Sequence, residues 1–102
     1  MTVTVHAIYP AREGARFDHD YYARHHMGLV REVLGPKGLI EITASRGLAG
    51  GPDTPPAYFA VAEMTFPDET TMQAALGDAE PLMADIPNFT DVEPDLLIGA
   101  RM

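Results

Sequence analysis

Apolar residues recur at helical spacing over Phe17–Leu34 and place one histidine on the apolar side of the predicted helix. At about 100° per residue, one continuous arc collects Tyr22, Ala23, His26, Leu29, Val30, Val33 and Leu34. Charged residues such as Arg24 fall on the opposite side. An apolar stripe of this width is typical of a helix that packs on a core. We therefore expect His26 to point inward and the adjacent His25 to lie at the flank.

Alternation of apolar and polar side chains, or a continuous apolar run, predicts four strands. These are Thr2–Tyr9, Leu39–Arg46, Ala57–Phe66 and Leu96–Ala100. The first alternating segment is rich in β-branched residues, which favour strands. Residues 47–56, between the second and third strands, contain three glycines and three prolines. We therefore expect a long exposed loop there rather than a linker between domains.

Capping residues and glycines set the ends of the helices. Asp18 or Asp20 can cap the first helix, and the Gly-Pro pair at 35–36 ends it. A second helix opens at the Pro-Asp pair 67–68, and its buried side is predicted to carry Met72, Ala75 and Leu76. After an interruption at 77–78, Ala79–Ile86 is predicted to form further helical turns with Leu82, Met83 and Ile86 facing inward.

The order of these elements predicts the fold. Strand, helix, strand, strand, helix, strand, with the middle strands joined as a hairpin, is the ferredoxin-like βαββαβ arrangement of the α+β class. Both helices would cover one face of a four-stranded antiparallel sheet. A chain of 102 residues is large enough for one core, so residues 1–102 are expected to form a single domain. The open sheet face keeps apolar residues, and we expect a second copy to cover it, giving a homodimer through the sheet faces.

Charge and composition exclude several classes of function. The chain has 15 acidic and 7 basic residues and a net charge of -8, which argues against a nucleic-acid or anionic-membrane surface. The absence of cysteine excludes disulfides, thiolate nucleophiles and zinc-thiolate sites. No apolar run approaches the roughly 20 residues of a membrane span, and no signal-peptide pattern opens the chain. We therefore expect a cytoplasmic protein.

His26 is the leading candidate for chemistry. A neutral imidazole has one donor and one acceptor nitrogen and titrates near physiological pH, so inside a pocket it can remove and return a proton. The alternative is a histidine hydrogen-bonded into the core. Tyr22 lies one turn earlier on the same face, and Tyr9 ends the first strand. Either hydroxyl can orient a substrate oxygen, or either ring can be core packing whose hydroxyl reaches solvent.

Several other polar residues have two interpretations each. Asp85 and Asn88 lie in a turn-rich segment, where such side chains commonly satisfy their own backbone. If Asp85 instead reaches His26, it would fix the imidazole tautomer and stabilise the imidazolium. Glu63 interrupts an otherwise nearly apolar third strand, so it lies either on a sheet surface or in a pocket with a perturbed environment. His6, inside the first strand, has the same two interpretations.

Patterns for metal and phosphate sites are missing from the sequence. His25 and His26 cannot both face one ion from a regular helix, and neither a His-x-x-x-His nor a Glu-x-x-His pair occurs. The glycines at 47, 50 and 51 lead into prolines rather than into a helix, which does not fit a phosphate-binding loop. We therefore predict no metal site and no resident cofactor.

Two segments resemble the EthD family of dimeric α+β barrel proteins. They are F-D-x-x-Y-Y-x-x-x-H-M at Phe17–Met27 and A-x-x-x-M-A-D-I-P-N-F-T-D at Ala79–Asp91. One departure is Gly28, where relatives commonly carry proline. The resemblance identifies His26 as the family's helix histidine, and it implies a face-to-face dimer with a small-molecule pocket between sheet and helices.

The resemblance and the residues together leave three functions open. The preferred one is a cofactor-independent isomerase, cyclase, dehydratase or decarboxylase acting on an apolar or aromatic metabolite. In it His26 is the acid/base group, with Tyr22 and Asp85 as helpers. The predicted ligand contacts are Tyr9, Val30, Glu63, Asn88 and Phe89. The alternatives are a non-catalytic carrier or accessory protein of a degradation pathway, and a haem-linked oxidoreductase with a histidine axial ligand.

Overall fold

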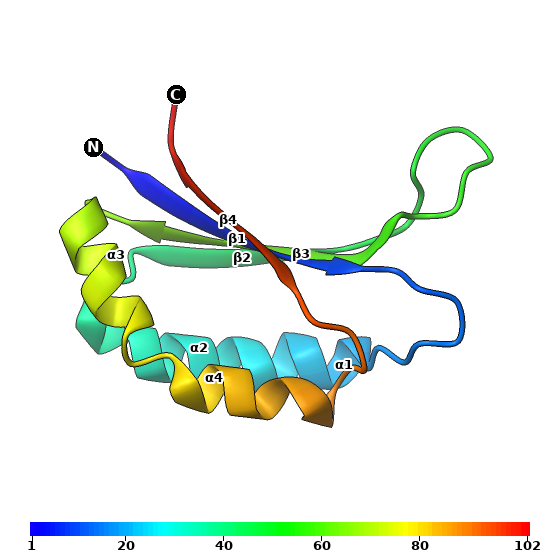
Figure 1. Cartoon of the computed structure of the whole chain (residues 1–102), viewed down its shortest axis with the longest axis horizontal. Coiled ribbons are helices and arrows are strands. Elements are labelled where there is room, and N and C mark those ends of the chain that lie inside the picture. The colour runs from blue at the N-terminus through cyan, green and yellow to red at the C-terminus, as the bar shows by residue number, and fades with distance from the viewer.

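Four antiparallel strands form one sheet in the computed structural model, which describes residues 1–102 of the chain. The strands are β1 (Val3–Pro10), β2 (Glu41–Arg46), β3 (Tyr58–Phe66) and β4 (Asp95–Ala100). Their order is β2-β3-β1-β4, and each neighbouring pair is antiparallel. The predicted ferredoxin-like α+β fold is therefore confirmed (Figure 1).

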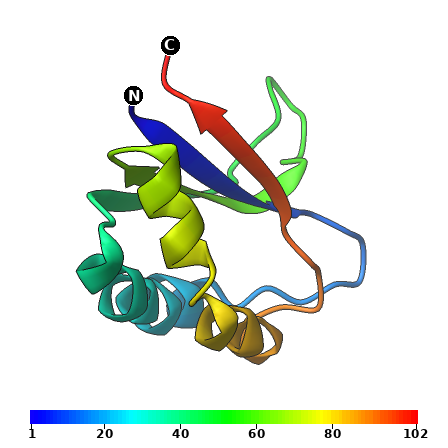
Figure 2. The ribbon, with the colours of Figure 1, turned by 60° about the vertical axis from the view of Figure 1, so that its left-hand side comes forward.

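The helical segments all lie on one face of this sheet (Figures 1 and 2). The first group comprises α1 (His19–Tyr21), the π-helical turn η1 (Tyr22–His26), α2 (Met27–Leu34) and the 3₁₀ turn η2 (Gly35–Lys37). The second comprises α3 (Glu69–Leu76), α4 (Glu80–Asp85) and the 3₁₀ turn η3 (Ile86–Asn88). As predicted, Asp18 caps the first helix by accepting from the Tyr21 N–H. None of these helices has the length and apolar character that crossing a bilayer would require.

The alternation along β1 and β3 divides the sheet into two faces. The face under the helices is built by buried residues that stand opposite one another in the β1–β3 ladder, and these are Val3, Val5, Ala7, Tyr9, Ala60, Ala62, Met64 and Phe66. The residues between them point to the other face, where His6 stands opposite Glu63. The core therefore lies between the helices and one face of the sheet, and no helix covers the other face (Figure 1).

A π-helical turn at Tyr22–His26 interrupts the first helix, where the sequence predicted regular α-helix. Its wider turn is closed by a bond from the Met27 N–H to the Tyr22 carbonyl, five residues earlier. Tyr22 and His26 stand at the two ends of this turn. The rings of Tyr22 and His26 stack, with centroids 5.5 Å apart and planes 16° apart. Both rings are buried, whereas Ala23, which the regular arc placed inward, is exposed.

The helices leave strand β4 largely uncovered. Leu96 and Ile98 pair with Ala7 and Val5, so they lie on the helix side of the sheet, yet they are 58% and 52% exposed. Leu97 between them is 56% exposed on the opposite face. The loop between β2 and β3 projects from the sheet, as the sequence predicted (Figure 1).

Candidate functional site

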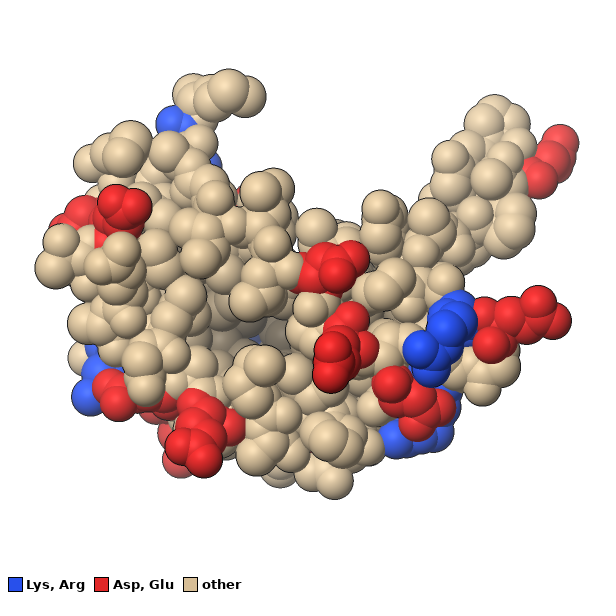
Figure 3. All heavy atoms as spheres, in the orientation of Figure 1, with Lys and Arg blue, Asp and Glu red and all other residues tan.

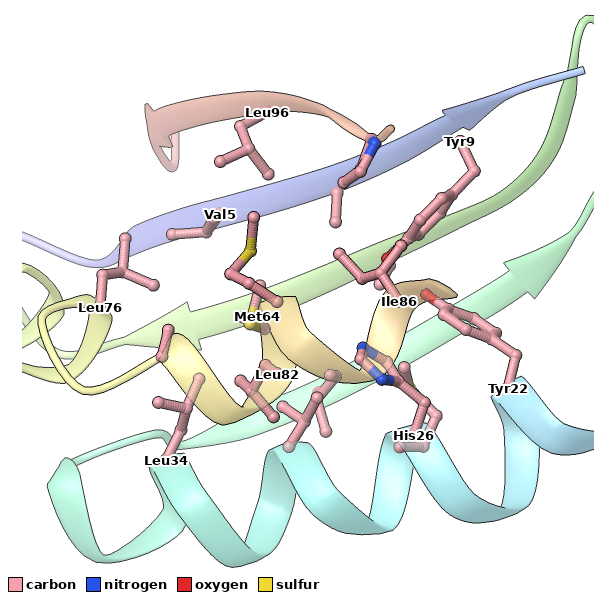
Figure 4. Close-up of a pocket in the computed structure, with 18 residues that line it drawn as sticks. Val5, Tyr9, Tyr22, His26, Leu34, Met64, Leu76, Leu82, Ile86 and Leu96 are labelled. Atoms are coloured by element: carbon pink, nitrogen blue, oxygen red, sulfur yellow. The ribbon is translucent and has the colours of Figure 1, made fainter. Parts of the chain in front are cut away.

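A cavity of about 80 Å³ lies between the sheet and the helices (Figure 4). Its buried walls come from β1, β3 and α2, and almost all of its lining side chains are apolar. Its outer rim comes from the α3–α4 region and the start of β4, where the lining residues Met83 and Leu96 are exposed. Three polar side chains also line it, and these are Tyr9, Tyr22 and His26. The structure thus brings three predicted polar site residues to one space.

His26 is held by a buried carboxylate. Its Nδ1 lies 2.9 Å from Asp85 Oδ2, and both side chains are under one-tenth exposed. The contact that the sequence left open is therefore present in the structure. Because the carboxylate is ionised and can only accept, the Nδ1–H is the donor. This bond selects the tautomer that leaves a lone pair on Nε2.

Asp85 accepts three hydrogen bonds in all. Its other oxygen, Oδ1, accepts from the Tyr21 hydroxyl at 2.6 Å and from the Asn88 side-chain amide at 3.0 Å. Burial raises the pKa of Asp85, but the bonds from Tyr21, Asn88 and His26 outweigh it and bring the pKa down to about 2. Asp85 is consequently a charged, fully engaged acceptor at neutral pH.

His26 itself is neutral at pH 7. Burial lowers the pKa of its imidazole, and this outweighs the hydrogen bond and charge of Asp85, which act to raise it. No side-chain or backbone group of the chain binds Nε2, and the ring lines the cavity (Figure 4). A neutral acceptor nitrogen therefore faces an apolar space.

The hydroxyls of Tyr9 and Tyr22 point toward the same end of the cavity (Figure 4). Their rings meet edge to face at 5.5 Å. Burial is the main reason that both pKa values are raised, with smaller contributions from Asp85 for Tyr9 and from Tyr9 for Tyr22. Both hydroxyls stay protonated at pH 7, and neither donates to a group of the chain. The site thus offers a ligand two free hydroxyl donors and, from Nε2 of His26, one free acceptor.

Two extended segments fix the distance between the helices that carry His26 and Asp85. Phe17 forms a bridge with Thr90, and the Asp18 N–H donates to the Phe89 carbonyl at 2.8 Å. The ring of Phe89 is fully buried, 4.7 Å from the imidazole of His26. This packing holds the imidazole against α4, so the hydrogen bond to Asp85 does not depend on a flexible loop.

The structure separates the predicted ligand contacts. Val30 lines the cavity with Tyr9, whereas Asn88 and Phe89 support Asp85 and His26 from behind. Glu63 does not line the cavity. It lies on the opposite face of the sheet, 2.9 Å from His6, because the strand alternation that turns its neighbours Ala62 and Met64 inward turns it outward. Its position corrects the prediction of a ligand contact there.

Sequence reasoning missed Tyr21. Its hydroxyl makes the shortest side-chain bond to Asp85, although the ring lies beside the buried arc rather than within it. The doublet Tyr21–Tyr22 was a usable signal, since two adjacent tyrosines on a helix point in different directions. Met83 was predicted to face inward, but it is exposed at the rim.

The site residues were tested for a fit to metal or haem. No group of three or more His, Cys, Asp or Glu side chains is placed to hold a metal ion. His26 is the residue that could ligate a haem iron, but the cavity of about 80 Å³ is smaller than an engineered cavity of about 150 Å³ that binds benzene. A porphyrin therefore does not fit the arrangement of side chains around His26.

Fold and site define an α+β protein with an apolar cavity and a buried His–Asp pair. The model of the EthD domain family matches residues 13–93, and the chain belongs to this family. No protein with a curated description matches the chain.

Solved structures share this fold. An EthD-like protein from Ralstonia eutropha JMP134 is 36% identical over 96% of this chain and 89% of its own, with a TM-score of 0.88. An ethyl tert-butyl ether degradation (EthD) family protein from Bacillus halodurans C-125 is 24% identical over 100% of both chains, with a TM-score of 0.77. A point mutant of SnoaB from Streptomyces nogalater, a cofactor-independent oxygenase, is 15% identical over 99% of this chain and 93% of its own. Its TM-score of 0.58 shows a shared fold.

Proposed function

We propose that this protein is a cofactor-independent acid/base enzyme acting on a small carbonyl or phenolic metabolite. The observation that carries the proposal is the unengaged Nε2 of His26, which faces an apolar cavity beside the free hydroxyls of Tyr9 and Tyr22. None of these three polar groups has a hydrogen-bond partner within the chain, so each is free to contact a ligand in the cavity. A substrate oxygen and an adjacent C–H would satisfy all three groups at once.

Proton transfer from carbon is the reaction that this geometry favours. Nε2 of His26 takes a proton from the carbon next to the carbonyl, and the electron pair of that C–H bond moves onto the carbonyl oxygen. The hydroxyls of Tyr9 and Tyr22 donate to the resulting oxyanion, which a water-excluding site stabilises strongly. Asp85 stabilises the imidazolium until the proton returns to the substrate. Isomerisation and cyclisation both require such an enolate.

We also propose that the protein works as a homodimer through the open sheet face. That face exposes Leu97 and leaves Ile8 and Val61 half-buried, without any helix above them. Face-to-face pairing of two identical sheets would cover these apolar side chains in both subunits simultaneously.

Exchange of α-protons for deuterium tests the proposed chemistry without knowledge of the natural substrate. A small ketone, 2-butanone, is incubated with the protein in D₂O and followed by ¹H NMR. We expect wild type to exceed the buffer rate and His26→Ala to lose about 10²–10⁴-fold of the catalysed rate, the usual contribution of a positioned base. His25→Ala is the matched control, because His25 is adjacent but exposed, and its rate should equal that of wild type.

The same assay separates an enzyme from a carrier. Wild type that binds 2-butanone but exchanges no faster than buffer would contradict the enzyme proposal and favour the carrier. Equal exchange by wild type and His26→Ala would remove the proposed base.

A further inference from the structure

An apolar strip continues outward from the rim of the cavity. Leu96 lines the cavity and Ile98 follows it on the same side of β4, and each is more than half exposed. Met83 of α4 stands across the opening and is 55% exposed. Figure 3 shows a hollow in this part of the surface. The buried apolar interior is thus continuous with an exposed apolar surface.

The enclosed volume limits how much of a ligand can be inside. A cavity of about 80 Å³ is about half the size of the cavity of about 150 Å³ that holds benzene. It accommodates a small head group next to Tyr9, Tyr22 and His26. The rest of any larger metabolite must leave through the opening and pass over Leu96 and Ile98.

The charges around the opening select against anions. No lysine or arginine lines the cavity. Pro94 lines the rim, and its chain neighbours Glu93 and Asp95 are both exposed acids. Acidic side chains lie beside the hollow in Figure 3. A ligand carboxylate or phosphate would meet repulsion at the rim and an uncompensated desolvation cost inside.

We infer that the ligand is a neutral molecule with a small oxygen-bearing head, a ketone in the simplest case, and an extended apolar body that runs over Leu96 and Ile98. This inference rests on the proposed function and adds the substrate class and its direction in the site. The head oxygen binds the hydroxyls of Tyr9 and Tyr22. The apolar body covers the exposed strip, which explains why side chains on the helix side of the sheet are uncovered.

Binding of a ketone series tests this assignment. Affinities of 2-butanone, 2-hexanone and 2-octanone are measured by ligand-observed NMR, with octanoate as the charged probe of equal carbon number to 2-octanone. In wild type each added methylene should tighten binding about two- to fourfold, since each buries apolar area on the strip. Octanoate should bind much more weakly than 2-octanone.

Two variants and a matched control test where the apolar body of the ligand lies. Leu96→Thr and Ile98→Thr should reduce the gain in binding affinity per added methylene. Leu97→Thr should keep it at protein concentrations that maintain the dimer, because Leu97 has nearly the same exposure on the same strand but faces the other side of the sheet. Threonine has the β-branched shape that suits a strand, so the fold of all three variants should be preserved.

Three results would overturn the inference. The first is a binding affinity that does not rise with the length of the ketone. The second is an affinity that rises with ketone length equally in all three variants and in wild type. The third is octanoate binding as tightly as 2-octanone. If Leu96→Thr or Ile98→Thr changes the oligomeric state without changing the gain, the strip is a protein interface instead. Failure of the base chemistry would appear as wild-type exchange no faster than buffer, or as equal exchange by wild type and His26→Ala. It would leave the affinities of the ketone series unchanged, so the two proposals can fail separately.

Discussion

The protein contains two histidine–carboxylate pairs of equal length on opposite faces of one sheet. On the helix side, His26 Nδ1 and Asp85 Oδ2 are 2.9 Å apart, with side chains 6% and 7% exposed. On the open side, His6 Nε2 and Glu63 Oε2 are also 2.9 Å apart, with side chains 27% and 36% exposed. The distance is the same, but only the first pair adjoins a cavity.

The difference lies in what surrounds each pair. Asp85 accepts two further bonds, from Tyr21 and Asn88, whereas Glu63 receives Arg101 at 3.2 Å in a partly solvated position. The second nitrogen of His26 faces the cavity, and that of His6 is buried without a partner. The proposed acid/base role of the first pair therefore rests on burial, on a carboxylate with two further hydrogen bonds, and on a free nitrogen that faces the cavity. Proximity alone does not supply these.

The largest expected difference between the two pairs is in catalysed proton exchange. Asp85→Asn can present its amide N–H to Nδ1, which selects the wrong tautomer of His26. A comparable change in a catalytic triad lowers turnover about 10⁴-fold, so we expect a loss of about 10²–10⁴-fold in exchange of 2-butanone. Glu63→Gln should exchange at the wild-type rate. If both variants lose activity equally, the distinction between the two faces is wrong.

Self-association should depend on the open face of the sheet and not on its helix side. Leu97→Thr removes apolar surface from the open face in both subunits, so we expect dimer association to weaken about ten- to a hundredfold, measured by analytical ultracentrifugation. Leu96→Thr, on the helix side of the same strand, should leave association unchanged. A wild-type monomer at high concentration would contradict the proposed dimer.

The smallest expected effect is on stability in mild acid. Because the pKa of His26 is lowered below its ordinary value of 6.5 in the folded state, the unfolded chain binds more protons below that pH and the folded state loses stability as pH falls. The free energy of unfolding, from urea titrations, should therefore decrease between pH 7 and 5. His26→Gln should weaken this decrease. Asp85 adds a second loss only between about pH 3.8 and 2, the interval between its ordinary and folded pKa values.

Local patterns were sufficient to predict much of this molecule. The alternation in the first strand and the arc around His26 predicted the sheet and the inward histidine, because periodicity depends only on neighbouring residues. Glu63 could not be placed, because its strand is apolar on both faces and nothing local distinguishes them. The contact of Tyr21 with Asp85 joins residues 64 positions apart, and the π-helical turn shifts side-chain directions away from those of a regular helix. Both depend on the packing of α4 against the first helix.

The central claim is that His26 carries a neutral, unprotonated Nε2 into the cavity. An imidazole ¹⁵N NMR spectrum at pH 7 reports the tautomer and charge of His26 and His6 in one sample, with and without 2-hexanone. We expect His26 to be protonated at Nδ1 only, and the ketone to shift the resonances of His26 while those of His6 stay unchanged. A His26 protonated at Nε2, or a ketone response at His6 instead, would contradict the account.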